Sequence, residues 1–237
     1  MKLMIFDGLD NCGKTWTINK LINYIEENQV YLKYDRVAFP SKELCSSDVF
    51  KNMVKPENRD NDEVILEFVN SIIADVKKGL IQYIKEGLDV LFIDRMMLST
   101  LIYQGGTNNK RIDHIVKLYS EMFESLEIKP SDVTHLIFKH KINDFKIEHD
   151  PSKLEFDKRY HEFRIGYDHI VKPQFLQSKP YLSSFYIFDE VMFYNREYGS
   201  YFNTTELNEL DESRISIINY NFLDQLNIES DPEPMNV

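Results

Sequence analysis

Short apolar runs alternate with stretches of helical spacing along this chain. Apolar runs of strand length occupy residues 3–6, 36–39, 90–93, 133–138 and 185–188. Apolar residues recur every three or four positions over residues 16–25, 61–86, 97–103, 111–126 and 152–170. The pattern of the second helix is interrupted near Gly79, and residues 41–58 are polar and irregular. Because strands that alternate with helices form parallel sheets, we predict a three-layer α/β protein in which helices flank a central, roughly five-stranded parallel sheet.

The most specific motif lies at the junction between the first strand and the first helix. Residues 8–15 read GLDNCGKT and fill every position of G-x-x-x-x-G-K-[ST]. In this motif backbone N–H groups and the helix N-terminus surround the phosphates, Lys14 reaches the β- and γ-phosphates, and Thr15 helps to hold Mg²⁺. We therefore predict a P-loop NTPase fold that binds ATP and Mg²⁺. The predicted ATP contacts are Gly8, Asn11, Cys12, Gly13, Lys14, Thr15 and Trp16.

Length, charge and composition narrow the class of protein. The 237 residues suit a single domain over 1–225, followed by an acidic tail over 226–237 that we expect to be disordered. The net charge of −11 argues against a nucleic-acid polymer as the main ligand but is compatible with a small nucleotide. No signal peptide and no apolar run of about 20 residues is present, so we expect a soluble, cytoplasmic protein without a membrane partner. The two cysteines and six histidines show no disulfide framework and no zinc-ligand spacing.

A second motif follows the third predicted strand. Asp94 suits a Mg²⁺ shell and the Arg95 guanidinium suits a phosphate, although an isolated Asp–Arg pair can simply cap a strand end. Here residues 94–106 read D-R-x-x-L-S-T-x-x-Y-Q-G-G, which closely resembles the signature of the thymidylate kinases, notably their bacterial form. The phosphate loop, the F-P pair at 39–40 and R-x-G-Y at 164–167 are also similar to that family, so the resemblance covers roughly residues 1–170.

The resemblance implies roles for the matched residues that would handle the phosphates. Lys14 and Thr15 would hold the ATP phosphates and Mg²⁺, and Asp94 would join the Mg²⁺ shell through water. Arg95 would grip the phosphate of the acceptor nucleotide. The predicted catalytic residues are Lys14, Asp94, Arg95, Lys141 and Lys146.

The resemblance also implies an acceptor site. Asp10 would meet the sugar 3′-hydroxyl, Tyr103 would pack where a 2′-hydroxyl would clash, and Ser99 and Gln104 would lie near the base. Phe68 matches an aromatic residue that stacks on thymine, but its helical spacing fits a core residue equally well. The predicted acceptor contacts are Asp10, Phe39, Lys42, Phe68, Arg95, Ser99, Tyr103 and Gln104.

The chain departs from the family pattern at three places. The family usually has an arginine after its F-P pair, and here the nearest basic residue is Lys42. Where the family has an arginine that reads the base, this chain has the apolar Ile72, so Asn70 or Ser71 would have to take over that contact. Asn11 occupies the loop position of a catalytic arginine, and the basic residues of the lid, which the resemblance places at about 139–150, are lysines and histidines only. Candidates to replace that arginine are Lys139, Lys141, Lys146, Lys153, Arg159 and Arg164. For any single lysine, a solvated loop face is the alternative interpretation.

The resemblance implies a deoxynucleoside monophosphate kinase that converts ATP and dTMP to ADP and dTDP, with dUMP or a modified pyrimidine nucleotide as other acceptors. Three alternatives stay open: a deoxynucleoside kinase, a kinase that acts on a modified base in DNA, and an inactive nucleotide-binding protein. A nucleoside kinase would need a carboxylate base, and the sequence Asp94-Arg95-Met96 differs from the Glu-Arg-Ser common in such enzymes. Members of the family are commonly homodimers, so a homodimer is expected.

Overall fold

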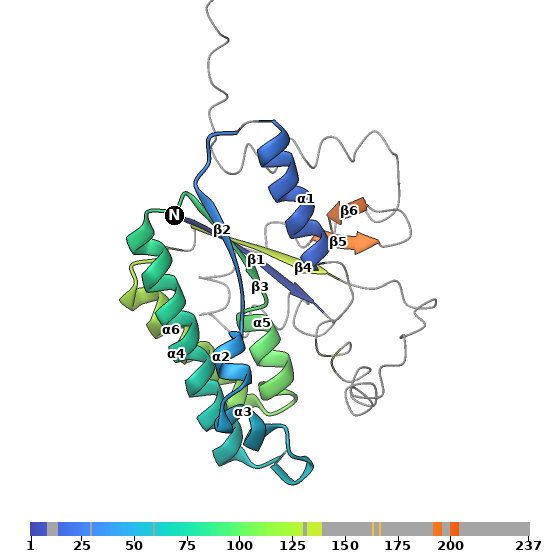
Figure 1. The fold of residues 1–237 in the computed structure, drawn as a ribbon. Coiled ribbons are helices and arrows are strands. Elements are labelled where there is room, and N and C mark those ends of the chain that lie inside the picture. The colour runs from blue at the N-terminus through green and yellow to red at the C-terminus, as the bar shows by residue number, and fades with distance from the viewer. Residues whose placement is uncertain are drawn as a thin grey trace, which may run out of the picture.

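The computed structural model describes residues 1–8, 14–28, 30–58, 60–129, 132–138, 163, 166, 192–195 and 200–203. Its centre is a parallel four-stranded sheet with the strand order β2-β3-β1-β4 (Figure 1). These strands are β1 (Lys2–Gly8), β2 (Tyr34–Ala38), β3 (Val90–Asp94) and β4 (Val133–Phe138). The predicted α/β class and parallel sheet are confirmed, whereas the strand expected at 185–188 lies outside the described residues. The antiparallel pair β5 (Met192–Asn195) and β6 (Ser200–Asn203) is an addition that the apolar pattern did not predict.

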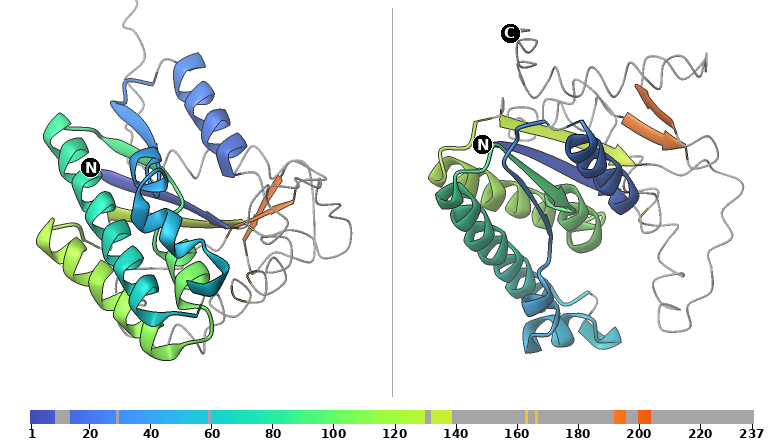
Figure 2. Two further views of the ribbon diagram at one scale, coloured as in Figure 1. Left: turned by 60° about the horizontal axis from the view of Figure 1, so that its bottom comes forward. Right: turned by 45° about the horizontal axis from the view of Figure 1, so that its top comes forward.

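Helices cover both faces of the sheet and give the predicted three layers. They are α1 (Lys14–Glu27), α2 (Lys42–Cys45), α3 (Asp48–Met53), the 3₁₀ turn η1 (Pro56–Asn58), α4 (Asp62–Glu86), α5 (Met97–Thr100), the π-helical turn η2 (Leu101–Gly105) and α6 (Asn109–Ser125). Helix α1 packs on one face, and α4, α5 and α6 pack on the other (Figures 1 and 2).

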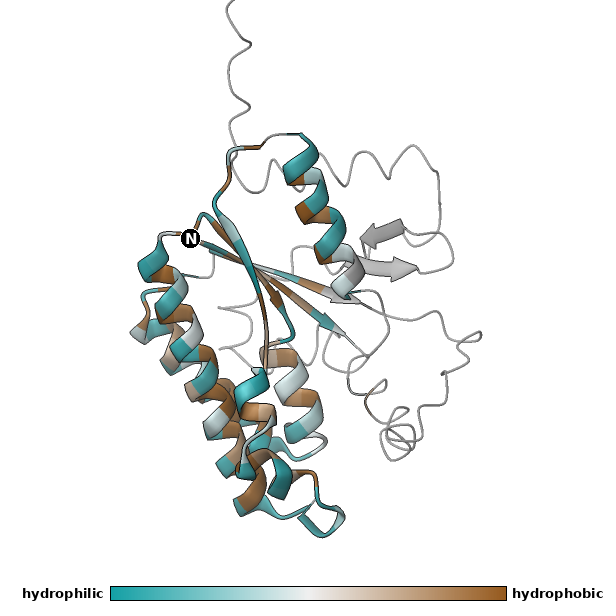
Figure 3. Ribbon diagram, in the orientation of Figure 1, coloured by the Kyte–Doolittle hydropathy of each residue, from teal (hydrophilic) through white to brown (hydrophobic). Residues whose placement is uncertain are grey.

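The two faces of the sheet are built by the alternation of side chains along each strand. In β1, Leu3 and Ile5 point into the core shared with α4, α5 and α6, whereas Met4 and Phe6 point toward α1. In the parallel register Leu3 lies opposite Leu91 of β3, so the two strands present the same pattern. Strands buried on both faces read as continuous apolar runs, as β3 does over residues 90–93, whereas the edge strand β2 begins with hydrophilic residues (Figure 3).

Helix α4 is continuous, so the predicted break near Gly79 is wrong. Asn61 caps its start by accepting from the backbone N–H groups of Glu63 and Val64, and Gly87 ends it with a left-handed φ of 66°. Gly79 packs closely against Phe39, because a Cβ there would lie 3.0 Å from Cζ of that ring and would push it by a few tenths of an ångström. Although α4 has 25 residues, neither it nor any other described helix is apolar enough over the width of a bilayer to span one.

The segment 41–58 is also more ordered than its polar sequence predicts. It contains α2, α3 and η1, because Ser41 accepts from the N–H of Leu44 and Ser47 accepts from the N–H of Phe50. Ser41 also donates to Asp75 of α4, which fixes the start of α2 on the long helix. The second strand is offset as well, since it begins at Tyr34 and ends before Phe39.

Candidate active site

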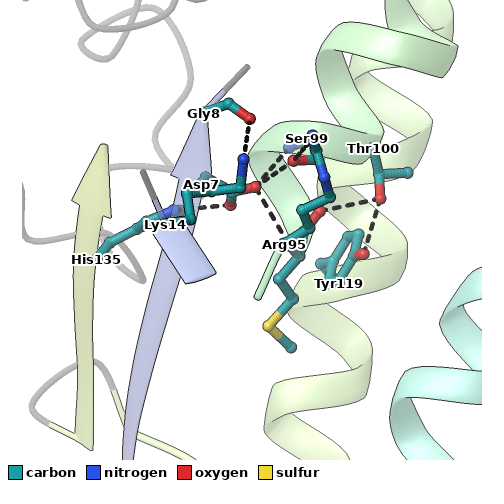
Figure 4. A network of polar contacts seen from close by, with 9 residues as sticks. Asp7, Gly8, Lys14, Arg95, Ser99, Thr100, Tyr119 and His135 are labelled. Atoms are coloured by element: carbon teal, nitrogen blue, oxygen red, sulfur yellow. Dashed lines mark hydrogen bonds and ion pairs between the residues drawn. The ribbon is translucent and has the colours of Figure 1, made fainter. Parts of the chain in front are cut away.

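The carboxyl ends of β1 and β3 lie side by side and lead into the starts of α1 and α5. In open α/β sheets this edge is where ligands bind. Gly8 ends β1 with a φ of 149°, a conformation that glycine enters without a steric penalty. The ammonium group of Lys14 donates to the carbonyl oxygen of Gly8 at 3.0 Å, and the residue is only 6 % exposed (Figure 4). The first turn of α1 is therefore held against the end of β1.

Thr15 and Asp94 bring a hydroxyl and a carboxylate together from the two motifs. Alternation along β3 puts Asp94 on the α1 side of the sheet, together with Phe92. The Thr15 hydroxyl donates to Oδ2 of Asp94 at 2.6 Å, across 79 residues of sequence. Both groups supply oxygen atoms, the ligand type that Mg²⁺ prefers.

Arg95 adopts a backbone conformation that is rare for a residue with a side chain. Its φ is 71°, which costs about 1–3 kcal/mol and persists only where neighbouring contacts enforce it. Its backbone N–H donates to the carbonyl of Phe6 at 2.9 Å. Its Nη1 lies 3.3 Å from Oγ of Ser99 and 3.2 Å from the hydroxyl of Tyr103, and the guanidinium lies 5.3 Å from the centre of the Tyr103 ring. The turn thus aims a cation along α5 and η2.

The Tyr103 ring also packs against another aromatic side chain. Phe163 packs edge-on against it with a centroid separation of 4.4 Å, and Gly166 lies close to Ile102, where a Cβ would come within 3.2 Å of that side chain. Arg95, Tyr103 and Phe163 therefore form a stack at this end of the core.

A buried polar network lies on the other side of β1. Asp7, which is 0 % exposed, accepts from Nε2 of His135 at 2.8 Å (Figure 4). Its Oδ1 accepts from the backbone N–H groups of Met96 and Ser99, both at 3.2 Å, and from the Ser99 hydroxyl. Burial raises the pKa of the Asp7 carboxyl, but the hydrogen bond and charge of His135, with the Ser99 and Met96 donors, outweigh it, so the pKa is lowered.

The other predicted acceptor residues that the structure describes, Phe39, Lys42, Phe68 and Gln104, make no side-chain hydrogen bond with Arg95. The Phe39 backbone N–H donates to the carbonyl of Asp94 at 3.1 Å, but its ring packs in the core. Lys42 is exposed on α2, and Gln104 is half-buried on η2. Phe68 is 1 % exposed and packs against Phe50, so in this structure it is a core residue.

Several predicted site residues lie outside the described residues: Asp10, Asn11, Cys12, Gly13, Lys141 and Lys146. For Trp16 only the helical backbone is described. Their roles stay predictions. Asp7 and His135, by contrast, were missed by the sequence reasoning. The available signal was a carboxylate and an imidazole at core-facing positions of strands that are otherwise apolar.

Comparison with known proteins supports the resemblance seen in the motifs. The family model described as thymidylate kinase matches residues 6–176. The chain belongs to the thymidylate kinase family. Two relatives are a thymidylate kinase of Fervidobacterium nodosum, 29% identical over 100 residues, and one of Plasmodium falciparum, 27% identical over 116 residues.

These matches cover only part of each thymidylate kinase. The matched segments are 42% of this chain and 49% of the Fervidobacterium protein, and 46% of this chain and 50% of the Plasmodium protein. The chain thus spans about half the length of the curated relatives it matches. The crystal structure of thymidylate kinase from Ehrlichia chaffeensis is 19% identical with a TM-score of 0.52, covering 95% of this chain and 98% of that one. That likeness is one of fold and supports the three-layer P-loop architecture.

Proposed function

We propose that this protein transfers the γ-phosphoryl group of ATP to dTMP and forms ADP and dTDP. The observation that carries the proposal is the meeting of the two motifs at one sheet edge, where Thr15 of the phosphate loop contacts Asp94 and the next residue is Arg95. A nucleoside monophosphate kinase needs a donor-phosphate site and an acceptor-phosphate cation next to each other. Family membership supports the same reaction.

On the donor side, Lys14 neutralises charge on the β- and γ-phosphates of ATP. The Thr15 hydroxyl is an oxygen ligand that suits Mg²⁺, and Asp94, which accepts a hydrogen bond from it at 2.6 Å, would reach the ion through water. An ion held there would supply positive charge that offsets the negative charge developing on the transferred phosphoryl group. Thr15 and Asp94 also join α1 to the end of β3, which keeps the donor site in register with Arg95.

On the acceptor side, Arg95 binds the phosphate of dTMP and orients one of its oxygens toward the γ-phosphorus. That oxygen forms the new P–O bond while the bond between the γ-phosphorus and the β–γ bridging oxygen breaks, and ADP leaves with the electron pair. The second pKa of a phosphate monoester is about 6, so the attacking oxygen is already ionised at neutral pH and no general base is needed. Alignment and charge neutralisation carry the catalysis.

Three finer features belong to the same proposal. Lys141 and Lys146 supply the positive charge that the family draws from an arginine, and closure of the segment 139–150 excludes water. The active protein is a homodimer. Ile72 is 4 % exposed in the core, so we propose that base choice rests on groups along η2 such as Gln104.

The test is an ADP-release assay with Mg-ATP in which dTMP, dUMP, dCMP, dGMP and thymidine are offered in parallel. Turnover with dTMP, and none with thymidine, is the expected result. Turnover with thymidine alone would replace the proposal with a nucleoside kinase. Tight ATP binding without turnover on any acceptor would indicate a DNA-modifying kinase or an inactive nucleotide-binding protein.

A further inference from the structure

Two ionisable side chains of the buried network have no place in the proposed chemistry. Asp7 is 0 % and His135 is 3 % exposed, and neither belongs to the phosphate loop or to the D-R motif. They lie on neighbouring strands, in the register that pairs Ile5 with His135 and Asp7 with Ile137. A buried carboxylate is costly unless it is paired and hydrogen-bonded, so their presence in an apolar core needs a reason.

The two carboxylate oxygens of Asp7 have separate partners. Oδ2 faces Nε2 of His135 at 2.8 Å, while Oδ1 accepts from the backbone N–H groups of Met96 and Ser99 and from the Ser99 hydroxyl. One side of Asp7 is therefore fixed by β4, and the other side fixes the turn between β3 and α5. Figure 4 shows this chain of contacts from His135 through Asp7 to Ser99.

The contacts of Asp7 with the turn lie on the residues that follow Arg95. The peptide N–H that follows it belongs to Met96 and is held by Asp7, and Ser99, also held by Asp7, lies 3.3 Å from the Arg95 Nη1. The positive φ of Arg95 needs such support, because strained residues persist only where their surroundings determine them. Displacement of this turn by even 1 Å would move the guanidinium away from the acceptor phosphate.

We propose that Asp7 and His135 are positioning residues for Arg95: His135 fixes the Asp7 carboxylate, and Asp7 fixes the turn that presents the guanidinium to the acceptor phosphate. The inference rests on the proposed kinase function. Neither residue touches a substrate in this account. Their role is to hold the acceptor side of the site, so their loss affects dTMP more than ATP.

The first variant is His135→Leu, which removes the partner of Oδ2 and fills its space. We expect kcat/KM for dTMP to fall about 10- to 100-fold, the effect of a small misplacement at a distance from the chemistry, while the KM for ATP changes less than about threefold. His135→Gln should recover most of the dTMP kcat/KM, because the Gln side-chain amide can donate to Oδ2 without a charge.

A matched control variant distinguishes a positioning role of His135 from a contribution to stability alone. Leu136 is the next residue of β4, but it packs in the other core with α1. Leu136→Ala is expected to lower the melting temperature while leaving kcat and both KM values nearly unchanged. If His135→Leu also loses only thermal stability, with its dTMP kcat/KM intact, the proposal is overturned.

A double-mutant cycle tests whether His135 acts through Asp7. Asp7→Asn keeps the shape of the side chain but weakens its charge-assisted hydrogen bonds, so a fall of about 5- to 10-fold in dTMP kcat/KM is expected. In that background, His135→Leu should add much less than it does in the wild type. Full additivity would overturn the coupling.

The single variant Asp7→Asn keeps the proposal testable if His135→Leu fails to fold: unchanged dTMP kinetics in a folded Asp7→Asn protein would refute it. Failure of the proposed function itself would look different, because the wild-type protein would then show no turnover with dTMP.

Discussion

Replacing Arg95 by lysine tests the acceptor site with little disturbance of the fold. Both residues carry a positive charge and both meet the same backbone constraint at φ 71°, so the strain of the turn is unchanged. A guanidinium has five N–H donors and can hold Ser99, Tyr103 and two phosphate oxygens at once, whereas an ammonium is a point charge with three donors. Loss of one charged hydrogen bond costs about 1.5–3 kcal/mol, which is about 10- to 160-fold in kcat/KM for dTMP.

The assay is steady-state ADP release, with dTMP varied at saturating ATP and then ATP varied at saturating dTMP. We expect Arg95→Lys to raise the KM for dTMP and lower kcat, and Arg95→Ala to do both more strongly. The matched control is Arg36→Lys on β2, where the arginine is exposed and donates to Asn19 of α1. A change confined to the KM for ATP in Arg95→Lys would show that Arg95 does not bind the acceptor phosphate.

Three further predictions address the metal, the core and the pH response. Asp94→Asn should raise the Mg²⁺ concentration needed for half-maximal turnover about 10- to 100-fold, since it removes the carboxylate that Thr15 contacts; an unchanged Mg²⁺ titration would contradict that role. Tyr119→Phe removes a buried hydrogen bond to Thr100, 3.0 Å long, and should lower the free energy of unfolding by about 0.5–1.5 kcal/mol in urea titrations; no change would show that the contact contributes nothing net. Because the pKa of the Asp7 carboxyl is lowered below its ordinary value of 3.8, its contribution to stability is fully present above pH 3.8 and is lost as pH falls through the folded-state pKa. Asp7→Asn should therefore be less stable than wild type at pH 7, with a difference that shrinks below pH 3.8; a constant difference down to acid unfolding would contradict the lowered pKa.

The strand and helix pattern predicted most of the architecture, because strands buried on both faces and long amphipathic helices leave strong local signals. The four strands of the described sheet were all anticipated, and β4 has the predicted bounds. The predicted break at Gly79 is wrong for a tertiary reason. Glycine usually weakens a helix, but here it makes room for the ring of Phe39, which comes from a different part of the chain.

The candidate site was predictable only where a local motif marks it. Lys14, Thr15, Asp94 and Arg95 were found from contiguous patterns, and the structure brings Thr15 and Asp94 into contact. The Asp7–His135 pair could not be derived in that way, because it joins residues 128 positions apart and depends on strand register. Phe68 illustrates the opposite case, since helical spacing alone does not distinguish a ring that packs against Phe50 from one that faces a ligand.

Phosphoryl transfer at this site can be followed by ³¹P NMR of Mg-ATP and dTMP incubated with the wild-type protein and with Lys14→Ala. We expect the signals of ADP and dTDP to grow in equal amounts with the wild type. With Lys14→Ala neither should appear, although its circular dichroism spectrum should match that of the wild type. Absence of dTDP with the folded wild-type protein, or dTDP formation at the same rate by Lys14→Ala, would contradict the assignment of phosphoryl transfer to this site.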